Sequence, residues 1–419
     1  MQVLIKNAHI LNVKSKYHQK KKDIFIQDGI IQKIATHINE KADYIIQAPN
    51  SFVSLGWVDI FADFCEPGFE HKETIESGIQ TAAAGGYTDV FLIPNLFPTT
   101  SSKANVEFLK SENQIVNTHP IGSISNQLKG KELAEMSDMN HAGAIAFSDG
   151  TQPVQNAGLL LKALQYVKTF DGILIEIPED QSLTLRGLMN EGITSTQIGL
   201  QGKPALAEDT YTFRNIELLN YTQSKLHLTG VSTKKSIEMI KQAKKKNQNL
   251  TCSVTPYHLL YNETALINYN THFKVTPPLR SEEDRKALIK AIQDGTIDCI
   301  ASHHIPQTFD EKQLEFEYAK NGMISLQVML SMLLKLDAQI PIEKWIELLS
   351  ENPRKIFKLP QPKIEEGEAA TLTVFNLNEQ WKFDKKNNKS LSENSPLFQQ
   401  ELTGKVIATI NNHFIHINE

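Results

Sequence analysis

The sequence predicts an α/β protein: a (β/α)8 TIM barrel joined to a small β-subdomain that is built from the N- and C-terminal segments. Eight short, almost continuously apolar runs recur along the middle of the chain, as expected for strands that are covered on both faces. Stretches with helical periodicity separate these runs, and eight strands that alternate with helices favour a closed parallel barrel. The two ends of the chain show alternating strand patterns instead.

The N-terminal segment, residues 1–51, includes an alternating pattern with the hairpin-turn signal Asp28-Gly29. The C-terminal segment, residues 361–419, alternates in the same way. Neither segment is long enough to form a stable sheet alone, so we expect the two to pair into one composite β-subdomain. The polar stretch 385–394 within the second segment is expected to be a surface loop.

Residues 52–360 are expected to form the barrel, whose working residues would lie at the carboxyl ends of the strands. The expected strands are 53–60, 89–93, 115–121, 144–147, 172–177, 226–231, 250–254 and 297–301. Helix periodicity marks 74–84, 157–168, 214–222, 235–245 and 282–292.

Composition excludes several classes of protein. The net charge of −5 over 419 residues gives no reason to expect nucleic acid. The first residues form a strand pattern rather than a signal peptide, and no apolar run approaches the length of a membrane span. Cys65, Cys252 and Cys299 lack metal-binding spacing and are expected to be buried free thiols. We therefore expect a cytoplasmic protein that binds neither nucleic acid nor membrane.

The most informative motif follows the first barrel strand, where residues 56–74 read GWVDIFADFCEPGFEHKET. This run resembles the dihydroorotase signature of the amidohydrolase superfamily, G-x-x-D-x-H-x-H-x-R-E-P-G-x-E-x-K-E-T, which binds zinc and substrate. Phe61 and Asp63 stand where the signature has its two metal histidines, and Cys65 stands for the arginine that grips the substrate carboxylate. Further segments similar to the family extend from about residue 1 to about 415, among them 82–88, Pro94-Asn95, 277–280, 294–298 and Asn352-Pro353.

The resemblance implies that the other metal positions are altered as well. Gly150 replaces an aspartate after the fourth strand, Ile177 a histidine after the fifth, and Gly230 a histidine after the sixth. His303 replaces the aspartate that serves the family as ligand and general base. Zinc needs about four nitrogen, oxygen or sulfur ligands, so we expect no metal, no other cofactor and no catalytic residue here.

The substrate-binding positions have changed too, since Thr276 replaces an asparagine and Gln307 a histidine, whereas Asn95 is kept. We expect a vestigial pocket formed by Phe61, Asp63, Cys65, Asn95, Gly150, Ile177, Gly230, Thr276, His303, His304 and Gln307.

Asp63 and His303 admit three interpretations, because the ends of the first and eighth strands are neighbours in a barrel but the two side chains need not meet. The two side chains are expected to form a hydrogen-bonded pair in the vacant metal cavity. One alternative is a one-metal site that uses Asp63, His303 and either Cys65 or His304, and the other is that the two side chains do not meet.

Several other polar residues are expected to have structural roles. His71 would cap or orient its loop, and His258 would be structural. Lys72 and Glu73 would form a helix-start charge pattern. The pair Glu179-Asp180 would lead into the next helix.

These features predict a dihydroorotase-like protein of pyrimidine biosynthesis that is catalytically inactive and acts as a structural or assembly partner. The resemblance suggests aspartate carbamoyltransferase as that partner, and a homodimer is the default assembly. One alternative is an active amidohydrolase that hydrolyses the C–N bond of another cyclic amide with a rebuilt site. The other is plain dihydroorotase activity.

Overall fold

Eight parallel strands form a barrel in the computed structural model, which describes residues 1–47, 50–112, 114–336 and 338–418. A bridge between Ala62 and His304 closes the barrel, and the Asp63 N–H donates to the His304 carbonyl over 2.9 Å. The predicted barrel is therefore confirmed. In sheet order the strands are β6 (Trp57–Ala62), β7 (Tyr87–Leu92), β8 (Asn117–Gly122), β9 (Ala146–Phe147), β10 (Leu174–Glu176), β13 (Leu226–Leu228), β14 (Leu250–Val254) and β15 (Cys299–Ile300).

Helices surround the barrel, and the five that the sequence predicts are present: α1 (Ile75–Ala84), α4 (Ala157–Lys168), α7 (Leu206–Thr222), α8 (Lys234–Lys244) and α10 (Glu282–Gln293). Helix α7 begins at Leu206, earlier than the predicted residue 214. Its first turns bury the polar residues Glu208 and Asp209, so the apolar periodicity that marks a helix in the sequence is missing there. The shorter helices are α2 (Lys103–Leu109), α3 (Met136–Ala142), α5 (Gln181–Thr184), α6 (Ile193–Ile198), α9 (Pro256–Leu260), α11 (Phe309–Lys312), α12 (Met329–Leu334), α13 (Ile342–Ile346) and α14 (Asn352–Ile356).

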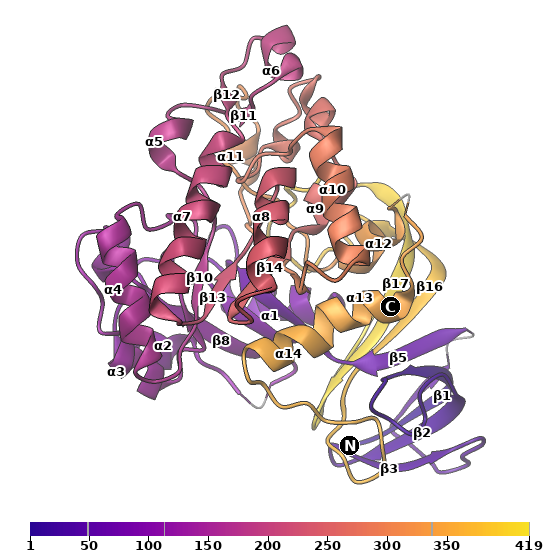
Figure 1. Ribbon diagram of the computed structural model, residues 1–419. Coiled ribbons are helices and arrows are strands. Elements are labelled where there is room, and N and C mark those ends of the chain that lie inside the picture. Colours follow the sequence, from indigo (N-terminus) through magenta and orange to yellow (C-terminus); the bar gives the residue numbers. More distant parts are fainter. Residues whose placement is uncertain (48–49, 113, 337, 419) are drawn as a thin grey trace.

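The two ends of the chain pair into one sheet, as predicted, in the order β18-β17-β16-β5-β1-β2-β3, with β4 also paired to β1. Strands β5 and β16 join the two segments in antiparallel register, with Val53 opposite Val374. In Figure 1 the indigo N-terminal strands and the yellow C-terminal strands meet beside the barrel. The strands are β1 (Gln2–Leu11), β2 (Lys21–Gln27), β3 (Ile30–Ala35), β4 (Tyr44–Gln47), β5 (Ser51–Leu55), β16 (Thr371–Phe383), β17 (Gln400–Asn411) and β18 (Phe414–Ile417).

The segment 385–394, predicted to be a surface loop, is instead partly buried against the barrel. Ser390, Ser392 and Asn394 are buried. The Ser392 hydroxyl donates to the Lys72 carbonyl over 2.8 Å, and the Asn394 side-chain amide donates to the Ile305 carbonyl over 3.0 Å. The prediction was wrong because these polar groups bond to barrel loops rather than to water. We call residues 390–394 the strap.

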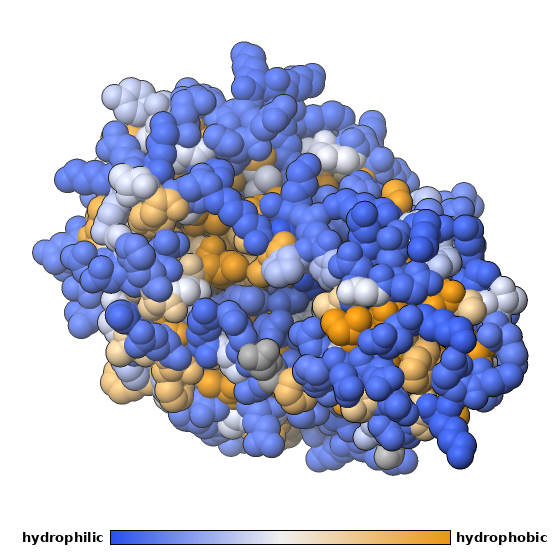
Figure 2. Space-filling view, turned by 90° about the horizontal axis from the view of Figure 1, so that it is seen from below, coloured by the Kyte–Doolittle hydropathy of each residue, from blue (hydrophilic) through white to orange (hydrophobic). Residues whose placement is uncertain are grey.

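The molecular surface is mainly hydrophilic on the face seen from below in Figure 2, where apolar residues reach the surface in separate areas. In the part of the chain that the structure describes, no helix is both long and apolar enough to cross a membrane. The three cysteines are free and buried, as expected.

A buried ion pair fastens helix α14 to the first two barrel strands, β6 and β7. The Arg354 guanidinium donates to the Asp89 carboxylate over 2.8 Å, to the Thr88 hydroxyl over 2.9 Å and to the Gly56 carbonyl over 3.0 Å. Although burial raises the pKa of Asp89, the charge of Arg354 and the hydrogen bonds from His119 and Asn117 hold it well below its usual range. Asp89 is therefore a buried anion that depends on its partners.

Replacing Arg354 by Met should lower the free energy of unfolding by about 3 kcal/mol or more, because the buried Asp89 carboxylate loses its principal counter-charge. Urea unfolding followed by circular dichroism would measure the loss. Lys103→Met is the matched control, because it breaks an exposed ion pair with Glu107, which should contribute less than ~1 kcal/mol. Equal effects of the two variants would contradict the proposed role of Arg354.

Candidate functional site

A cavity of about 670 Å³ opens at the carboxyl ends of the barrel strands. This volume is typical of small-molecule sites, and the location is the one that barrels of this kind use for function. Its lining includes Asp63, Cys65, Asn95, Thr276, His303 and Gln307 from the predicted pocket, together with Phe69, His71, Lys72, Thr151, Gln152, Tyr257, Val275, Ile305, Pro306, Glu311, Lys320, Asn321 and Gly322.

Asp59 sets the geometry of the site by joining the first barrel strand to the last. Its carboxylate accepts from the Ser302 N–H over 2.6 Å and from the Ser302 hydroxyl over 2.7 Å. Burial raises the pKa of Asp59 to about 7. The sequence analysis assigned no role to Asp59, although Asp59 belongs to the G-x-x-D part of the family signature that this chain keeps. That match could have indicated a structural role. The bond holds the chain after β15 against β6 and thereby brings His303 to Phe61.

His303 stacks on Phe61, with ring centroids 4.4 Å apart and an interplanar angle of 27°. The predicted Asp63–His303 hydrogen bond is wrong. His303 Nε2 is hydrogen-bonded to the Thr229 hydroxyl over 2.8 Å, and no partner for its Nδ1 is found among the described residues. Asp63 instead accepts from the Cys65 N–H over 2.8 Å. The Phe61 ring covers the face of the His303 imidazole, and the edge of the imidazole meets Thr229. Asp63 and His303 therefore have different partners.

A line of buried side chains continues from His303 across the barrel interior. Ser253 donates to the Thr229 hydroxyl over 2.8 Å, and Ser253 is hydrogen-bonded to His227 Nε2 over 3.0 Å. His227 Nδ1 in turn meets the Thr251 hydroxyl at 2.8 Å. Burial, followed by the nearby His258 and His227, lowers the pKa of His303 to about 3, so its imidazole is neutral at physiological pH.

Gly230 and Gly150 leave no room for a ligand-bearing side chain. A Cβ on Gly230 would lie 2.7 Å from His303 Cε1, and a Cβ on Gly150 would lie 1.7 Å from Asn95 Oδ1. Both glycines also have positive φ, +68° and +62°, a region that disfavours other residues. The space beside each glycine is therefore already filled by a neighbouring side chain.

Asn95, the retained member of the substrate-binding positions, is engaged within the protein. Its side-chain amide donates to the Asp149 carbonyl over 3.2 Å, and its oxygen accepts from the Thr151 N–H over 3.1 Å. Asp149 accepts from the Ile124 and Ser125 N–H groups, each over 2.9 Å. Asn95 thus secures the loop that contains Gly150.

Two other predicted pocket residues are unsuited to the roles that their positions have in the family. Cys65 is buried, and burial, followed by the carboxylates of Asp63 and Glu73, raises the pKa of its thiol above the usual range, so the position of the arginine carries no charge. Ile177 belongs to the apolar core inside the barrel, together with Phe61.

Lys72 and Glu73 do not form the predicted helix-start charge pattern. Thr74 caps α1, and Glu73 is fully buried. Its carboxylate accepts from the Ser390 hydroxyl and, over 3.2 Å, from the Leu391 N–H of the strap. Lys72 pairs with Glu311 at 2.8 Å and donates to Gln307 over 2.9 Å. Glu73 also accepts from the Ser77 hydroxyl in the first turn of α1, so these two residues fix the strap and the loop after β15 as well as the start of the helix.

His304 faces the buried contact between Glu73 and the strap rather than the cavity. Its Nδ1 accepts from the Ser325 N–H over 3.2 Å, and its Nε2 lies 3.5 Å from the Glu73 carboxylate.

The remaining polar residues have structural surroundings. His258 Nε2 lies 3.1 Å from the Pro277 carbonyl and Nδ1 lies 2.8 Å from the Thr255 hydroxyl, in line with the predicted structural role. Glu179 pairs with Lys203 at 2.8 Å, and Asp180 caps α5. His71 is exposed at the edge of the cavity.

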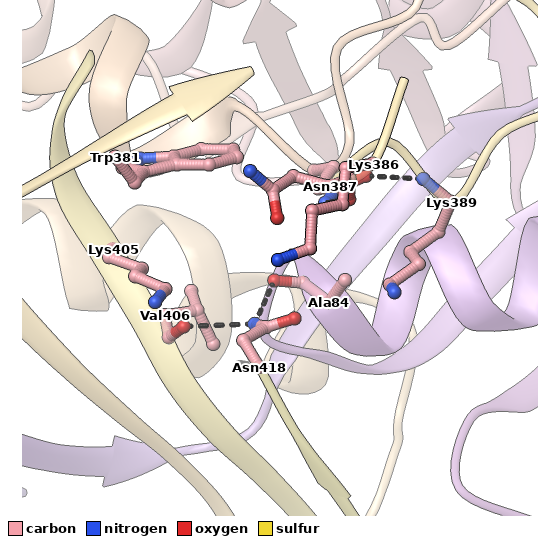
Figure 3. A pocket seen from close by; sticks show the side chains of 9 residues that line it. Ala84, Trp381, Lys386, Asn387, Lys389, Lys405, Val406 and Asn418 are labelled. Carbon is pink, nitrogen blue, oxygen red and sulfur yellow. Dashed lines mark hydrogen bonds between the residues drawn. The ribbon is translucent and has the colours of Figure 1, made fainter. Parts of the chain in front are cut away.

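A second hollow lies between the barrel helix α1 and the β-subdomain (Figure 3). Asn418 reaches into it and donates to the Ala84 and Val406 carbonyls, each over 2.9 Å. Its volume of about 60 Å³ is well below the roughly 300 Å³ of the smallest usual ligand pockets. This hollow is therefore too small to be the candidate site.

Comparisons with known proteins match the chain over its whole length. The family model described as "Dihydro-orotase-like" matches residues 52–236, and that of the "Amidohydrolase family" matches residues 209–412. A protein named dihydroorotase from Acetivibrio thermocellus is 37% identical and covers 100% of this chain and 99% of its own. Another, from Caldicellulosiruptor saccharolyticus, is 40% identical and covers 98% of this chain and 97% of its own. The chain belongs to the dihydroorotase-like family of the amidohydrolase superfamily.

Solved structures support the fold of this dihydroorotase-like protein. An L-hydantoinase from Arthrobacter aurescens superposes with a TM-score of 0.84 at 23% identity, over 99% of this chain and 95% of its own. A dihydropyrimidinase from Brevibacillus agri gives 0.83 at 17% identity, over 100% and 95%. At such identities the likeness extends to the fold alone.

The side chains at the family's metal positions do not fit a zinc centre. Phe61, Ile177, Gly150 and Gly230 have no side-chain donor atoms, and the remaining two, Asp63 and His303, turn to different partners. Among the described residues, no three histidine, cysteine, aspartate or glutamate side chains are grouped so that they could hold a metal ion. The alternative one-metal site that joins Asp63 to His303 is therefore not formed.

Glu176, on β10 next to Ile177, is a buried carboxyl group that the sequence analysis overlooked. It accepts from the Tyr211 hydroxyl and, over 3.2 Å, from the Val154 N–H. Burial raises its pKa from 4.5 to about 8, with a further rise from the charge of Asp149. At neutral pH the folded protein therefore keeps a proton that the unfolded chain has released.

Stability should fall as the pH rises from about 4.5 to about 8 because of Glu176. In that window the unfolded state binds fewer protons at this residue than the folded state. Glu176→Gln has no such proton and should gain stability relative to the natural protein by a few kcal/mol between pH 5 and pH 8. Urea unfolding of both proteins at the two pH values tests this, and parallel pH dependences would contradict it.

Proposed function

We propose that this protein is a catalytically inactive member of the dihydroorotase-like family that serves pyrimidine biosynthesis in the cytoplasm as a structural or assembly partner. The Phe61–His303 stack carries the proposal, because it places an apolar ring and a neutral imidazole where the family signature has metal ligands. Without zinc there is no metal-bound water of lowered pKa to attack an amide carbon. We assign no catalytic residue and no cofactor to this site.

The alternative is an active cyclic amidohydrolase that hydrolyses a C–N bond with a rebuilt site. Two observations favour it. The relatives at 35% to 40% identity are named dihydroorotase, and the cavity at the barrel mouth is open enough for a small ring. The relatives' names favour activity, whereas the side chains of this chain favour inactivity. We give more weight to the side chains, because the chemistry depends on them.

Purified protein should contain well under one zinc per chain and should not hydrolyse dihydroorotate above the buffer rate at neutral pH, because the donor atoms and the general-base aspartate are missing. Elemental analysis and a hydrolysis assay test both statements, with the Acetivibrio thermocellus relative as the matched comparison.

Phe61→His should not restore turnover, since the other positions still lack donors and such residues act as a unit. Two tightly bound zinc ions, or turnover that scales with protein after removal of contaminants, would overturn the proposal.

Association is the second consequence of the proposal. The chain keeps the barrel and the β-subdomain of its family. Selection for a surface that binds a partner would explain why the fold is retained. We propose aspartate carbamoyltransferase as the partner and a two-fold homodimer as the default state of the protein alone.

Co-purification from native extract should recover a transcarbamoylase, and light scattering of the isolated protein should give the mass of a dimer, about twice 47.2 kDa. Mixing the two proteins should raise the thermal midpoint of the transcarbamoylase, because binding to the folded state stabilises it. A strictly monomeric protein that recovers no transcarbamoylase and leaves its midpoint unchanged would refute this association.

A further inference from the structure

Two buried lysines hold the loop that forms one wall of the cavity at the barrel mouth. The loop, residues 313–322, follows α11, and its last three residues line the cavity. We call it the flap. Lys312, the last residue of α11, is 4% exposed, and Lys274, which follows the short helix η3 (Thr271–Phe273), is 5% exposed. Lysines are almost never fully buried unless they are paired, so these two residues call for a physical explanation.

Both lysines bond to backbone carbonyls of the flap and to no carboxylate. Among the described residues neither of them forms an ion pair. Each Nζ instead has two carbonyl acceptors, which belong to Phe316 and Glu317 for Lys274, at 2.6 and 2.9 Å, and to Lys320 and Gly322 for Lys312, at 2.8 and 3.2 Å.

The number of acceptors matches a neutral amine rather than an ammonium group. An ammonium group has three N–H donors, whereas a neutral amine has two. With two acceptors at each nitrogen, the protonated forms of Lys274 and Lys312 leave one hydrogen without an acceptor among the described residues. Burying a charge and leaving a buried donor unpaired both cost free energy. The closed flap is therefore more stable around the neutral lysines.

The groups that surround Lys312 do not offset this cost. Burial, followed by the neighbouring charge of Lys274, lowers the pKa of Lys312 to about 7, and Glu311 acts in the opposite direction. Glu311 is already paired with Lys72 at 2.8 Å. His272, on η3, is close enough to repel Lys312 when its imidazole is protonated.

Lys274 has the same imbalance to a smaller degree. Burial lowers its pKa to about 8, while the carboxylate of Glu317 on the flap acts in the opposite direction. The charges of Lys203, just before α7, and of Lys320 on the flap lower the pKa further. The Phe316 ring, whose centroid lies 5.2 Å from Nζ, favours the cation and limits the effect.

Apart from the two lysines, the flap has few anchors. Most of its side chains are exposed, and Phe316 and Ala319 are buried. The N–H groups of Lys320 and Gly322 donate to the Glu311 and Lys274 carbonyls, each over 3.0 Å. Segments with few buried contacts open locally at low free energy, so the state of the two lysines has a large influence on this loop.

We propose that the flap is a pH-responsive cover of the cavity, which closes as Lys274 and Lys312 lose their protons and loosens when they are protonated. In the open flap both nitrogens reach water, where a lysine keeps its proton up to about pH 10.5. Between about pH 7 and that value the closed flap binds fewer protons than the open flap, so closure becomes more favourable as the pH rises. This holds whether or not the cavity has a catalytic role.

Hydrogen exchange of the flap amides in the natural full-length protein tests this device. Exchange is followed by mass spectrometry from pH 6 to pH 9 and corrected for the intrinsic rates. Protection of the flap should rise at least about tenfold between pH 7 and pH 9, because proton release from either lysine favours the closed form. A peptide from α4 is the internal reference and should show no such rise, since the effect of Glu176 on global stability has the opposite sign.

The double variant Lys274→Met and Lys312→Met tests the two groups directly. It keeps long side chains but removes both ionisable groups, so the protection of its flap should not depend on pH. Lys320→Met is the matched control, because it removes an exposed lysine of the same flap and should leave the rise with pH in place.

Carbon NMR of lysine Cε in the natural protein gives a readout that does not need the double variant to fold. Two signals should titrate near pH 7 and pH 8, whereas exposed lysines titrate at about pH 10.4.

The flap is not such a device if no lysine titrates below pH 9, if its protection stays flat or falls as the pH rises, or if the double variant shows the same rise as Lys320→Met. Each of these results would leave the proposed function intact, because none of them concerns zinc, turnover or the partner.

Discussion

The closure of the barrel between β6 and the chain after β15 is the constraint on which the rest of the site depends. The Asp59 carboxylate holds both the N–H and the hydroxyl of Ser302, and the bridge from Ala62 to His304 continues the contact. Because these bonds fix the two strand ends in register, Phe61 and His303 must face each other inside the barrel. The stacked rings of Phe61 and His303 fill the space inside the barrel where the two strand ends meet.

The changes at the family's metal positions are sterically linked to their neighbours. His303 occupies the space beside Gly230, and Asn95 occupies the space beside Gly150. Restoring a larger side chain at either glycine would displace a residue that other bonds hold in place. The side chains at these positions therefore form a packed arrangement of their own, and a single substitution at either glycine would disturb it.

The strap connects the β-subdomain to the mouth of the barrel. Ser390 and Leu391 bond to the buried Glu73 carboxylate, and Asn394 bonds to the loop after β15. Glu73 in turn faces His304 at 3.5 Å. The C-terminal segment thus stabilises the loops that shape the cavity, which explains how residues far apart in the sequence define one site.

The sequence by itself determined the barrel, the pairing of its two ends and the loss of ligand atoms at Phe61, Ile177, Gly150 and Gly230. Apolar runs, turn signals and residue types are local properties, so they can be read along the chain. The tertiary structure alone decided the partners of polar side chains. His303 bonds to Thr229 instead of Asp63 and Glu73 bonds to the strap, because such contacts depend on distances between remote segments. For the same reason the burial of Glu176, Lys274 and Lys312 had no signal in the sequence.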